Sequence, residues 1–98
     1  MFVVLTYDIE MNNSGPKRLN KVAKICQGYG VRVQCSVFEL EINIEELTEL
    51  KAKLTGVIDS EKDSIRIYNI GNTKKNNKID IIGKKEKIEI TEKGAVIF

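Results

Sequence analysis

An aspartate at the end of an apolar segment is the first candidate for chemistry in this sequence. Residues 2–6 (FVVLT) are apolar or strand-favouring, and Tyr7, Asp8 and Ile9 follow them. This pattern favours a short strand, covered on both faces, at the centre of a sheet. A carboxylate at the end of such a strand stands on a rigid support and still reaches water, so Asp8 is a candidate catalytic residue. An aspartate there also commonly starts a turn or caps a backbone amide, and both interpretations stay open.

The residue types that the sequence lacks limit that chemistry. It contains no His, which excludes an imidazole base, a Ser-His or Cys-His nucleophile pair and a His-ligated zinc. Its two cysteines, Cys26 and Cys35, have no C-x-x-C spacing, and we expect both to be small buried residues in a reducing compartment. Hydrolysis by this chain would therefore need carboxylates, a metal-bound water or both.

The basic residues are concentrated in one stretch. Residues 16–32 contain five Lys or Arg and no acidic residue, whereas residues 39–49 contain five Glu and no basic residue. The basic stretch can meet phosphate groups, and the alternative is an ordinary solvated surface. The predicted nucleic-acid-binding residues are Lys17, Arg18, Lys21, Lys24 and Arg32, a set that Lys74, Lys75 and Lys78 would extend.

A helix is predicted to follow Asp8 and to carry most of these charges. Ser14 or Gly15 can cap it and Pro16 fits its first turn, while apolar residues recur at helical spacing at Leu19, Val22, Ala23 and Cys26. Basic residues near its N-terminus oppose the helix dipole unless an anion binds there. Gly28 and Gly30 are expected to end it, because glycine tolerates the left-handed cap conformation.

Residues 31–42 predict extended structure with a change of phase. The apolar side of the segment passes from Val31, Val33, Cys35 and Val37 to Phe38, Leu40 and Ile42. A shift of one residue indicates a bulge, a bend or two separate strands. In each case we expect Arg32, Gln34, Ser36 and Phe38 to begin on the same side.

The remaining residues predict a second helix and further strands. Asn43 and Glu46 form a capping-box pattern ahead of an apolar stripe of leucines, and residues 63–70 alternate as a strand does. This order of elements favours an α+β sandwich with both helices on one face of a mostly antiparallel sheet. We assign residues 1–70 to this core. Residues 71–98 form a C-terminal extension with short strands, suited to pairing with a sheet edge on this or another chain.

Length and composition are those of one small globular domain. The chain has 98 residues, of which 42% are hydrophobic and 31% charged, enough for a single two-layer core. No apolar run approaches the roughly 20 residues that a membrane span needs, and no targeting pattern precedes the first strand. We therefore expect a cytoplasmic protein that does not enter membranes.

Three segments together resemble one known family. They are residues 7–9 (YDI), 29–39 (YGVRVQCSVFE) and 63–68 (DSIRIY). With the chain length, they make the chain similar to the small CRISPR-associated endoribonucleases that partner the adaptation integrase. The resemblance covers residues 1–70. It implies a ferredoxin-like βαββαβ fold, which resolves the change of phase into two strands, and a symmetric homodimer whose C-terminal strands add to the partner's sheet.

The resemblance also implies a site. Asp8 of each protomer would hold a divalent metal, usually Mg²⁺ or another such as Mn²⁺, across the two-fold axis. Arginine would neutralise phosphate charge, Ser36 would bond a phosphate oxygen, and Phe38 would pack or stack beside it. Some relatives carry two arginines where this chain has Lys17 and Arg18, and lysine lacks the bidentate fork. The residues that would surround Asp8 are Tyr7, Arg18, Arg32, Ser36 and Phe38.

The implied activity takes two forms. One is metal-dependent cleavage of RNA or double-stranded DNA, and the other is a non-catalytic bridge that holds two integrase dimers during spacer acquisition. A related endoribonuclease toxin of the virulence-associated type is a further alternative. An RNA-recognition sheet is the least favoured, because aromatic content is only 6% and no paired stacking aromatics are evident.

Overall fold

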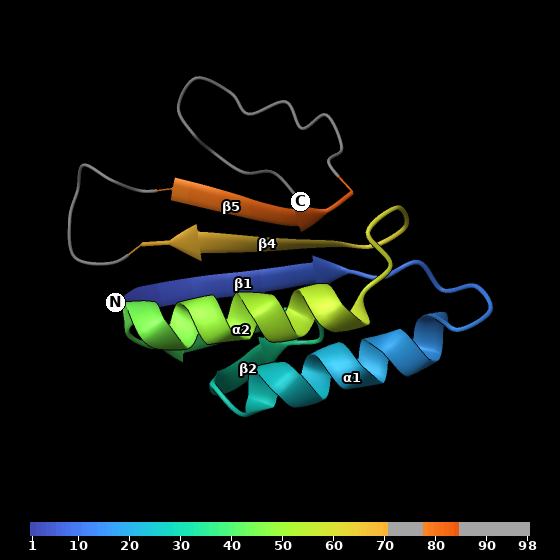
Figure 1. Cartoon of the computed structure of the whole chain (residues 1–98). Coiled ribbons are helices and arrows are strands. Elements are labelled where there is room, and N and C mark those ends of the chain that lie inside the picture. The colour runs from blue at the N-terminus through green and yellow to red at the C-terminus, as the bar shows by residue number, and fades with distance from the viewer. Residues whose placement is uncertain (71–77, 85–98) are drawn as a thin grey trace, which may run out of the picture.

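Residues 1–70 and 78–84 are described in the computed structural model of the chain (Figure 1). These residues form one five-stranded sheet and two helices. The strands are β1 (Phe2–Asp8), β2 (Gly30–Gln34), β3 (Val37–Glu41), β4 (Ser64–Asn69) and β5 (Lys78–Gly83), and the helices are α1 (Gly15–Gln27) and α2 (Ile44–Val57).

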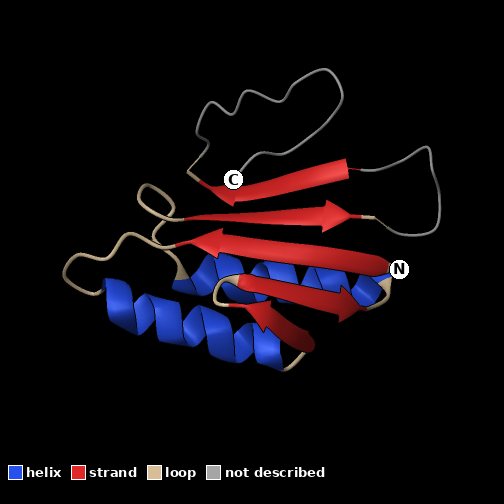
Figure 2. Ribbon diagram, turned by 180° about the vertical axis from the view of Figure 1, so that it is seen from behind, coloured by secondary structure: helices blue, strands red, loops and turns tan. Residues whose placement is uncertain are grey.

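Strand β1 lies at the centre of the sheet. The strand order is β2-β3-β1-β4-β5, and every neighbouring pair is antiparallel. Both helices lie on one face, and Figure 2 shows the sheet from the other face, which no described helix covers. The predicted α+β, ferredoxin-like architecture with an additional C-terminal strand is therefore confirmed.

The two faces of β1 differ in burial. Val3, Leu5 and Tyr7 point to the helices and are buried, whereas Val4 and Thr6 are half-buried and Asp8 is exposed. The expectation that β1 is covered on both faces is wrong for the described residues. The apolar run led to the wrong expectation because both faces of β1 carry apolar residues. The two-residue period of a strand therefore does not distinguish its covered face from its uncovered face.

Helix α1 begins and ends as predicted, with Gly28 at its C-terminus, but the conformation of this cap differs from the expected one. Ser14 is its N-cap and Pro16 lies in its first turn. Its buried side includes Val22 and Cys26. Gly28 has φ −74° and is right-handed, so the expected left-handed cap is wrong. Backbone amides close the last turn instead, with the Gly28 N–H donating to the Ile25 carbonyl at 3.0 Å.

Strands β2 and β3 confirm that the change of phase divides two strands. Arg32 opposes Phe38, but Gln34 opposes Val37, and the register shifts between the two pairs. Opposed residues share a face, so Arg32 and Gln34 lie on opposite faces, and their expected common side is wrong. The bulge adds one residue and reverses the alternation. A side chain at Gly30 would overlap the Glu39 carbonyl, so close packing explains this glycine.

Helix α2 covers the centre of the sheet. Its N-terminus forms the predicted capping box, in which the Asn43 side chain accepts from the Glu46 amide at 2.7 Å and the Glu46 carboxylate accepts from the Asn43 amide at 3.0 Å. Leu47, Leu50 and Leu54 are its buried stripe, as expected. Within residues 1–70 and 78–84, neither helix is long and apolar enough to cross a membrane.

Strand β5 shows where part of the C-terminal extension lies. It pairs with β4 of the same chain, from Asn69 opposite Lys78 to Ser64 opposite Gly83. The prediction of short strands within residues 71–98 is confirmed for β5, and its partner is this chain's own sheet. The predicted strands within residues 85–98, and Lys74 and Lys75, lie outside the described residues, so their pairing with a second chain stays a prediction.

Candidate active site

Asp8 stands at one end of the central strand, on the face that no described helix covers. It is the last residue of β1, it is exposed, and it opposes Ser64 of β4. Alternation along β1 places Thr6 on the same face and Tyr7 on the other. Asp8 is therefore a carboxylate in contact with water at the end of the central strand, which is the position that the sequence predicted for it.

Tyr7 faces the helices and fixes the turn between β2 and β3. Its hydroxyl donates to the Cys35 carbonyl at 3.1 Å, and its backbone N–H donates to the Ser36 carbonyl at 3.2 Å. Burial raises the pKa of Tyr7, against an opposing influence from Arg32. The buried, neutral Tyr7 hydroxyl and its hydrogen bond to a backbone carbonyl therefore hold the β2–β3 turn in position. Ser36, half-buried in that turn, is thereby held near the end of β1.

Phe38 and Arg32 form a stacked pair on the same face as Tyr7. Phe38 is fully buried, and its ring centroid lies 6.1 Å from that of Tyr7. The guanidinium carbon of Arg32 lies 5.3 Å from the Phe38 ring centroid, a cation–π distance. Phe38 thus packs in the core, whereas the exposed Arg32 can present its charge outward from the edge strand.

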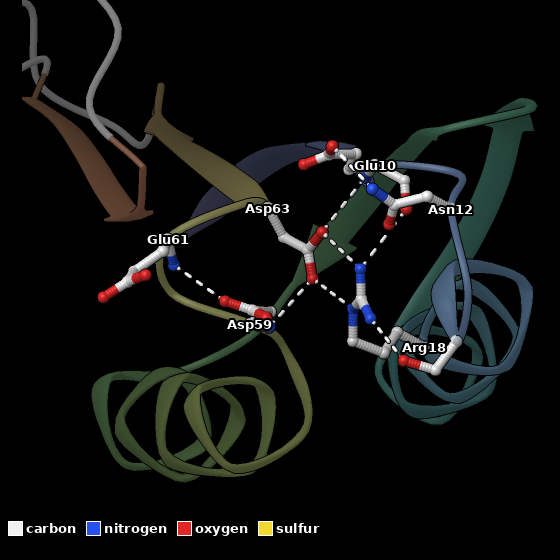
Figure 3. A network of polar contacts seen from close by, with 7 residues as sticks. Glu10, Asn12, Arg18, Asp59, Glu61 and Asp63 are labelled. Atoms are coloured by element: carbon white, nitrogen blue, oxygen red, sulfur yellow. Dashed lines mark hydrogen bonds and ion pairs between the residues drawn. The ribbon is translucent and has the colours of Figure 1, made fainter.

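Arg18 is held by an acidic residue to which the sequence assigned no role (Figure 3). Its Nε donates to Asp63 Oδ2 at 2.7 Å and its Nη2 donates to Asp63 Oδ1 at 3.2 Å, a bidentate ion pair. Asp63 has no exposed surface and is the one buried charged residue among those described. Its position directly before a strand was visible in the sequence, but its partner is 45 residues away, and no local pattern joins the two.

Two backbone amides complete the environment of Asp63. The Glu10 N–H donates to Oδ1 at 3.0 Å and the Asp59 N–H donates to Oδ2 at 2.8 Å. Burial by itself opposes ionisation, but the hydrogen bonds from Arg18 and from these amides outweigh it and hold the pKa of Asp63 below its ordinary value. Asp63 is accordingly a charged anchor that joins the loop after β1 to the loop before β4.

Three of the four predicted nucleic-acid-binding residues on α1 are exposed to solvent. Lys17, Lys21 and Lys24 are all exposed, and none forms an ion pair with a residue that the structure describes. Their positions place them away from the buried stripe of α1. Helix α1 also contacts β2, the strand that carries Arg32. Only the backbone of Lys78 is described, at the start of β5.

The predicted residues therefore divide between the two faces of the sheet. Asp8 lies on the uncovered face, whereas Tyr7, Arg32 and Phe38 lie on the helix face, and Arg18 lies in the loop and helix region beside them. What unites them is the end of the sheet, where β1 finishes and the β2–β3 turn begins. Ser36 is the predicted residue that this turn brings to that end. A cluster of all the predicted residues around Asp8 therefore stays a prediction.

The possible metal ligands of one chain are few. Among residues 1–70 and 78–84, no group of three or more Cys, Asp or Glu residues could hold an ion. A closed protein cage of the kind that zinc and calcium use is thus not formed by the described residues. An exposed carboxylate does fit Mg²⁺, which keeps several waters and takes one or two carboxylates.

Comparison of the chain with known proteins finds one family and relatives that carry the name of that family. Residues 1–78 match the family described as CRISPR associated protein Cas2. A protein of Halalkalibacterium halodurans, named CRISPR-associated endonuclease Cas2, is 50% identical over 93 residues, which are 94% of this chain and 96% of that protein. A protein of Moorella thermoacetica, named CRISPR-associated endoribonuclease Cas2 1, is 44% identical over 71 residues, which are 71% of this chain and 74% of that protein.

A solved structure supports the same relationship. The crystal structure of Streptococcus pyogenes Cas2 at pH 6.5 superposes with a TM-score of 0.69 and 47% sequence identity, over 72% of this chain and 87% of that one. A hypothetical protein from Thermus thermophilus, TT1823, superposes with a TM-score of 0.65 at 28% identity.

Proposed function

Because the chain belongs to the CRISPR-associated Cas2 family, as its sequence predicted, we propose that it is an endonuclease. It would cleave phosphodiester bonds in RNA or double-stranded DNA, in the cytoplasm, as part of spacer acquisition. The proposal is supported by the names of its relatives, which are called endonuclease or endoribonuclease. The observation that carries it is Asp8, an exposed carboxylate at the rigid end of the central strand.

Asp8 is the proposed ligand of a divalent metal, Mg²⁺ or Mn²⁺. One carboxylate per chain is a weak site alone, and a second copy related by two-fold symmetry would supply another. When bound, such an ion would activate water and neutralise charge on the scissile phosphate. The contribution of the chain is the fixed position of Asp8, since a carboxylate on a paired strand needs little reorganisation to bind.

We propose a symmetric homodimer that forms through the uncovered face of the sheet. That face bears apolar residues in contact with water, among them Phe2, which is 36% exposed, and Val31, which is 66% exposed. Apolar sheet faces are normally covered by another layer. A second copy placed there would also bring two Asp8 side chains to one interface. Sedimentation at several protein concentrations tests this proposal: we expect twice the mass of one chain, and a monomer would contradict it.

The proposed nucleic-acid surface is basic and lies on the helix side. Lys17, Lys21 and Lys24 of α1 supply exposed charge, and Arg32 supplies a guanidinium oriented by Phe38. Each such contact adds affinity that depends on salt and not on sequence. Ser36, in the turn that Tyr7 holds, is the proposed hydrogen-bond donor to a phosphate oxygen at the same end of the sheet.

The decisive experiment is cleavage by the purified full chain. Labelled single-stranded RNA and duplex DNA are incubated with Mg²⁺ or with EDTA, using the wild type, Asp8→Asn and Asp80→Asn. Asp80 is a matched control because it is an aspartate of the same sheet that already pairs with Lys51 at 2.8 Å. We expect cleavage with Mg²⁺ by the wild type and by Asp80→Asn, and none by Asp8→Asn. Undiminished cleavage by Asp8→Asn would refute the site.

A non-catalytic scaffold that bridges the adaptation integrase is the second candidate. It is favoured by the small number of possible metal ligands among the described residues, together with the exposed lysines of α1. It predicts that Asp8→Ala still binds duplex DNA and the integrase and supports spacer capture. It also predicts that removing residues 85–98, which leaves β5 in place, abolishes capture. Full capture by that truncation would count against a bridging role for the extension.

A further inference from the structure

The loop between β1 and α1 is held at both ends by one ion pair. Arg18 Nη2 donates to the Glu10 carbonyl at 3.2 Å and Arg18 Nη1 donates to Ser14 Oγ at 2.7 Å, while Asp63 accepts from the Glu10 N–H. Both backbone groups of Glu10 are therefore bound to the same pair. Figure 3 shows the guanidinium of Arg18 between Asp63 and this loop.

The backbone on both sides of Asp8 is held by hydrogen bonds that residues close to it in the chain make. Before Asp8, the Tyr7 N–H is bonded to the Ser36 carbonyl. After it, Ile9 is buried and Glu10 is bonded to the ion pair. Asp8 thus lies between two fixed points of the backbone, and both set the direction in which its Cα–Cβ bond leaves the strand.

Arg18 has little capacity left for a phosphate. A guanidinium carries five N–H donors, and hydrogen bonds to Asp63, Glu10 and Ser14 already use four of them, which leaves one N–H on Nη1. Its charge is also balanced by a carboxylate 2.7 Å away. A balanced charge releases no counterion when nucleic acid binds, so it adds nothing to the salt-dependent part of the affinity.

We infer that Arg18 and Asp63 are positioning residues, which fix the loop after Asp8 and thereby the backbone that carries the Asp8 side chain, and that Arg18 is not a phosphate ligand. The inference rests on the proposed function in that Asp8 is taken as the working residue. It gives a role to Asp63, which cannot reach substrate because it has no exposed surface. A displacement of about 1 Å at a reacting group can cost on the order of 100-fold in rate, so small movements of this loop matter.

The first test separates a phosphate ligand from a positioning residue by salt dependence, without any cleavage. Binding of duplex DNA is measured in EDTA at several salt concentrations for the wild type, Lys17→Gln and the double variant Arg18→Gln/Asp63→Asn, which removes both charges of the pair. We expect Lys17→Gln to reduce the log–log slope by about 0.9 and the double variant to leave it unchanged. A reduction by about 0.9 in the double variant overturns the inference.

The second test follows the loop and the reaction. In Asp63→Asn we expect the Glu10 amide to lose protection from hydrogen exchange, and kcat to fall by roughly 100-fold with KM unchanged. Arg18→Lys keeps the positive charge but loses the bidentate guanidinium. If Asp63→Asn does not fold, Arg18→Lys replaces it in this test, and we expect the same fall in kcat with KM unchanged. Unchanged kcat in folded variants, or a rise in KM alone, overturns the inference. Absence of cleavage by the wild type refutes the proposed function only, since exchange and salt slope still decide the role of Arg18.

Discussion

Replacing Asp63 with Asn should destabilise the protein more than any exposed charge substitution. The change keeps the shape of the side chain but removes the charge that balances Arg18. One carboxylate oxygen becomes an NH₂ group, so two of the four hydrogen bonds that Asp63 accepts lose their acceptor. The donor that replaces it then faces other donors, in a site with no exposed surface to admit water.

The size of the effect follows from burial. Breaking a buried ion pair by removing one partner costs about 3–5 kcal/mol, because the other charge is left uncompensated. A surface pair contributes only about 0–1 kcal/mol. Asp80 makes a pair of nearly the same length with Lys51, but its side chain is 42% exposed. Asp63→Asn should therefore lower the free energy of unfolding by about 3–5 kcal/mol, and Asp80→Asn by no more than about 1 kcal/mol.

The effect should also depend on pH in one direction. The pKa of Asp63 is held below its ordinary value of 3.8 in the folded protein. Its charge therefore contributes stability that is complete above that value and is lost as pH falls through the folded pKa. The difference between wild type and Asp63→Asn should be constant from neutral pH down to about pH 5, and should shrink below pH 3.8.

Urea denaturation followed by far-ultraviolet circular dichroism measures both quantities. Protein concentration must be held constant, because association with a second chain would shift the midpoint. The slope of unfolding free energy against urea should not change, which shows that the folded state is the same. A loss in Asp63→Asn no larger than that in Asp80→Asn at pH 7, or an equal loss at pH 7 and pH 3, would refute this account of Asp63.

Three further predictions concern the core, the thiols and a helix cap. Phe38→Ala should cost about 3–5 kcal/mol of unfolding free energy, because Phe38 is fully buried; Phe38→Leu should cost clearly less, and equal losses would contradict its packing role. In the native protein at pH 8, a thiol-reactive aromatic disulfide should modify the exposed Cys35 and spare Cys26, whose burial raises its pKa to about 12; equal rates for the two thiols would be inconsistent with this. Asn43→Ala should cost about 1 kcal/mol through loss of the capping box, and an effect no greater than that of the exposed Asn20→Ala would show that the cap contributes little.

Local patterns were sufficient to predict most elements of the fold. Helical spacing and cap residues identified α1 and α2, and the Asn43–Glu46 box was confirmed in both of its hydrogen bonds. Alternation identified the strands, and the change of phase at residues 37–38 indicated two strands, although β2 and β3 are divided slightly earlier, by the turn at residues 35–36. Each of these features depends on neighbours within a few residues, which a sequence displays directly.

The errors arise where the outcome depends on contacts that are distant in sequence. Cys35 was expected to be buried, yet it lies exposed in a turn whose position depends on Tyr7. For Arg18, the sequence did not indicate its bidentate partner Asp63, which follows α2 in the chain. The covered face of β1 could not be read from a strand that is apolar on both sides. Each of these three features depends on packing between elements that are distant in sequence, which the periodicity of hydrophobic residues does not show.

The most direct test of the account is the number of divalent ions that the protein binds through Asp8. Mn²⁺ is titrated into wild type and Asp8→Asn, and free Mn²⁺ is followed by electron paramagnetic resonance, with Asp80→Asn as the control. The account predicts one ion for every two chains in the wild type and in the control, and loss of that ion in Asp8→Asn. Binding that persists in Asp8→Asn, or one ion for every chain, would contradict a site shared between two Asp8 carboxylates.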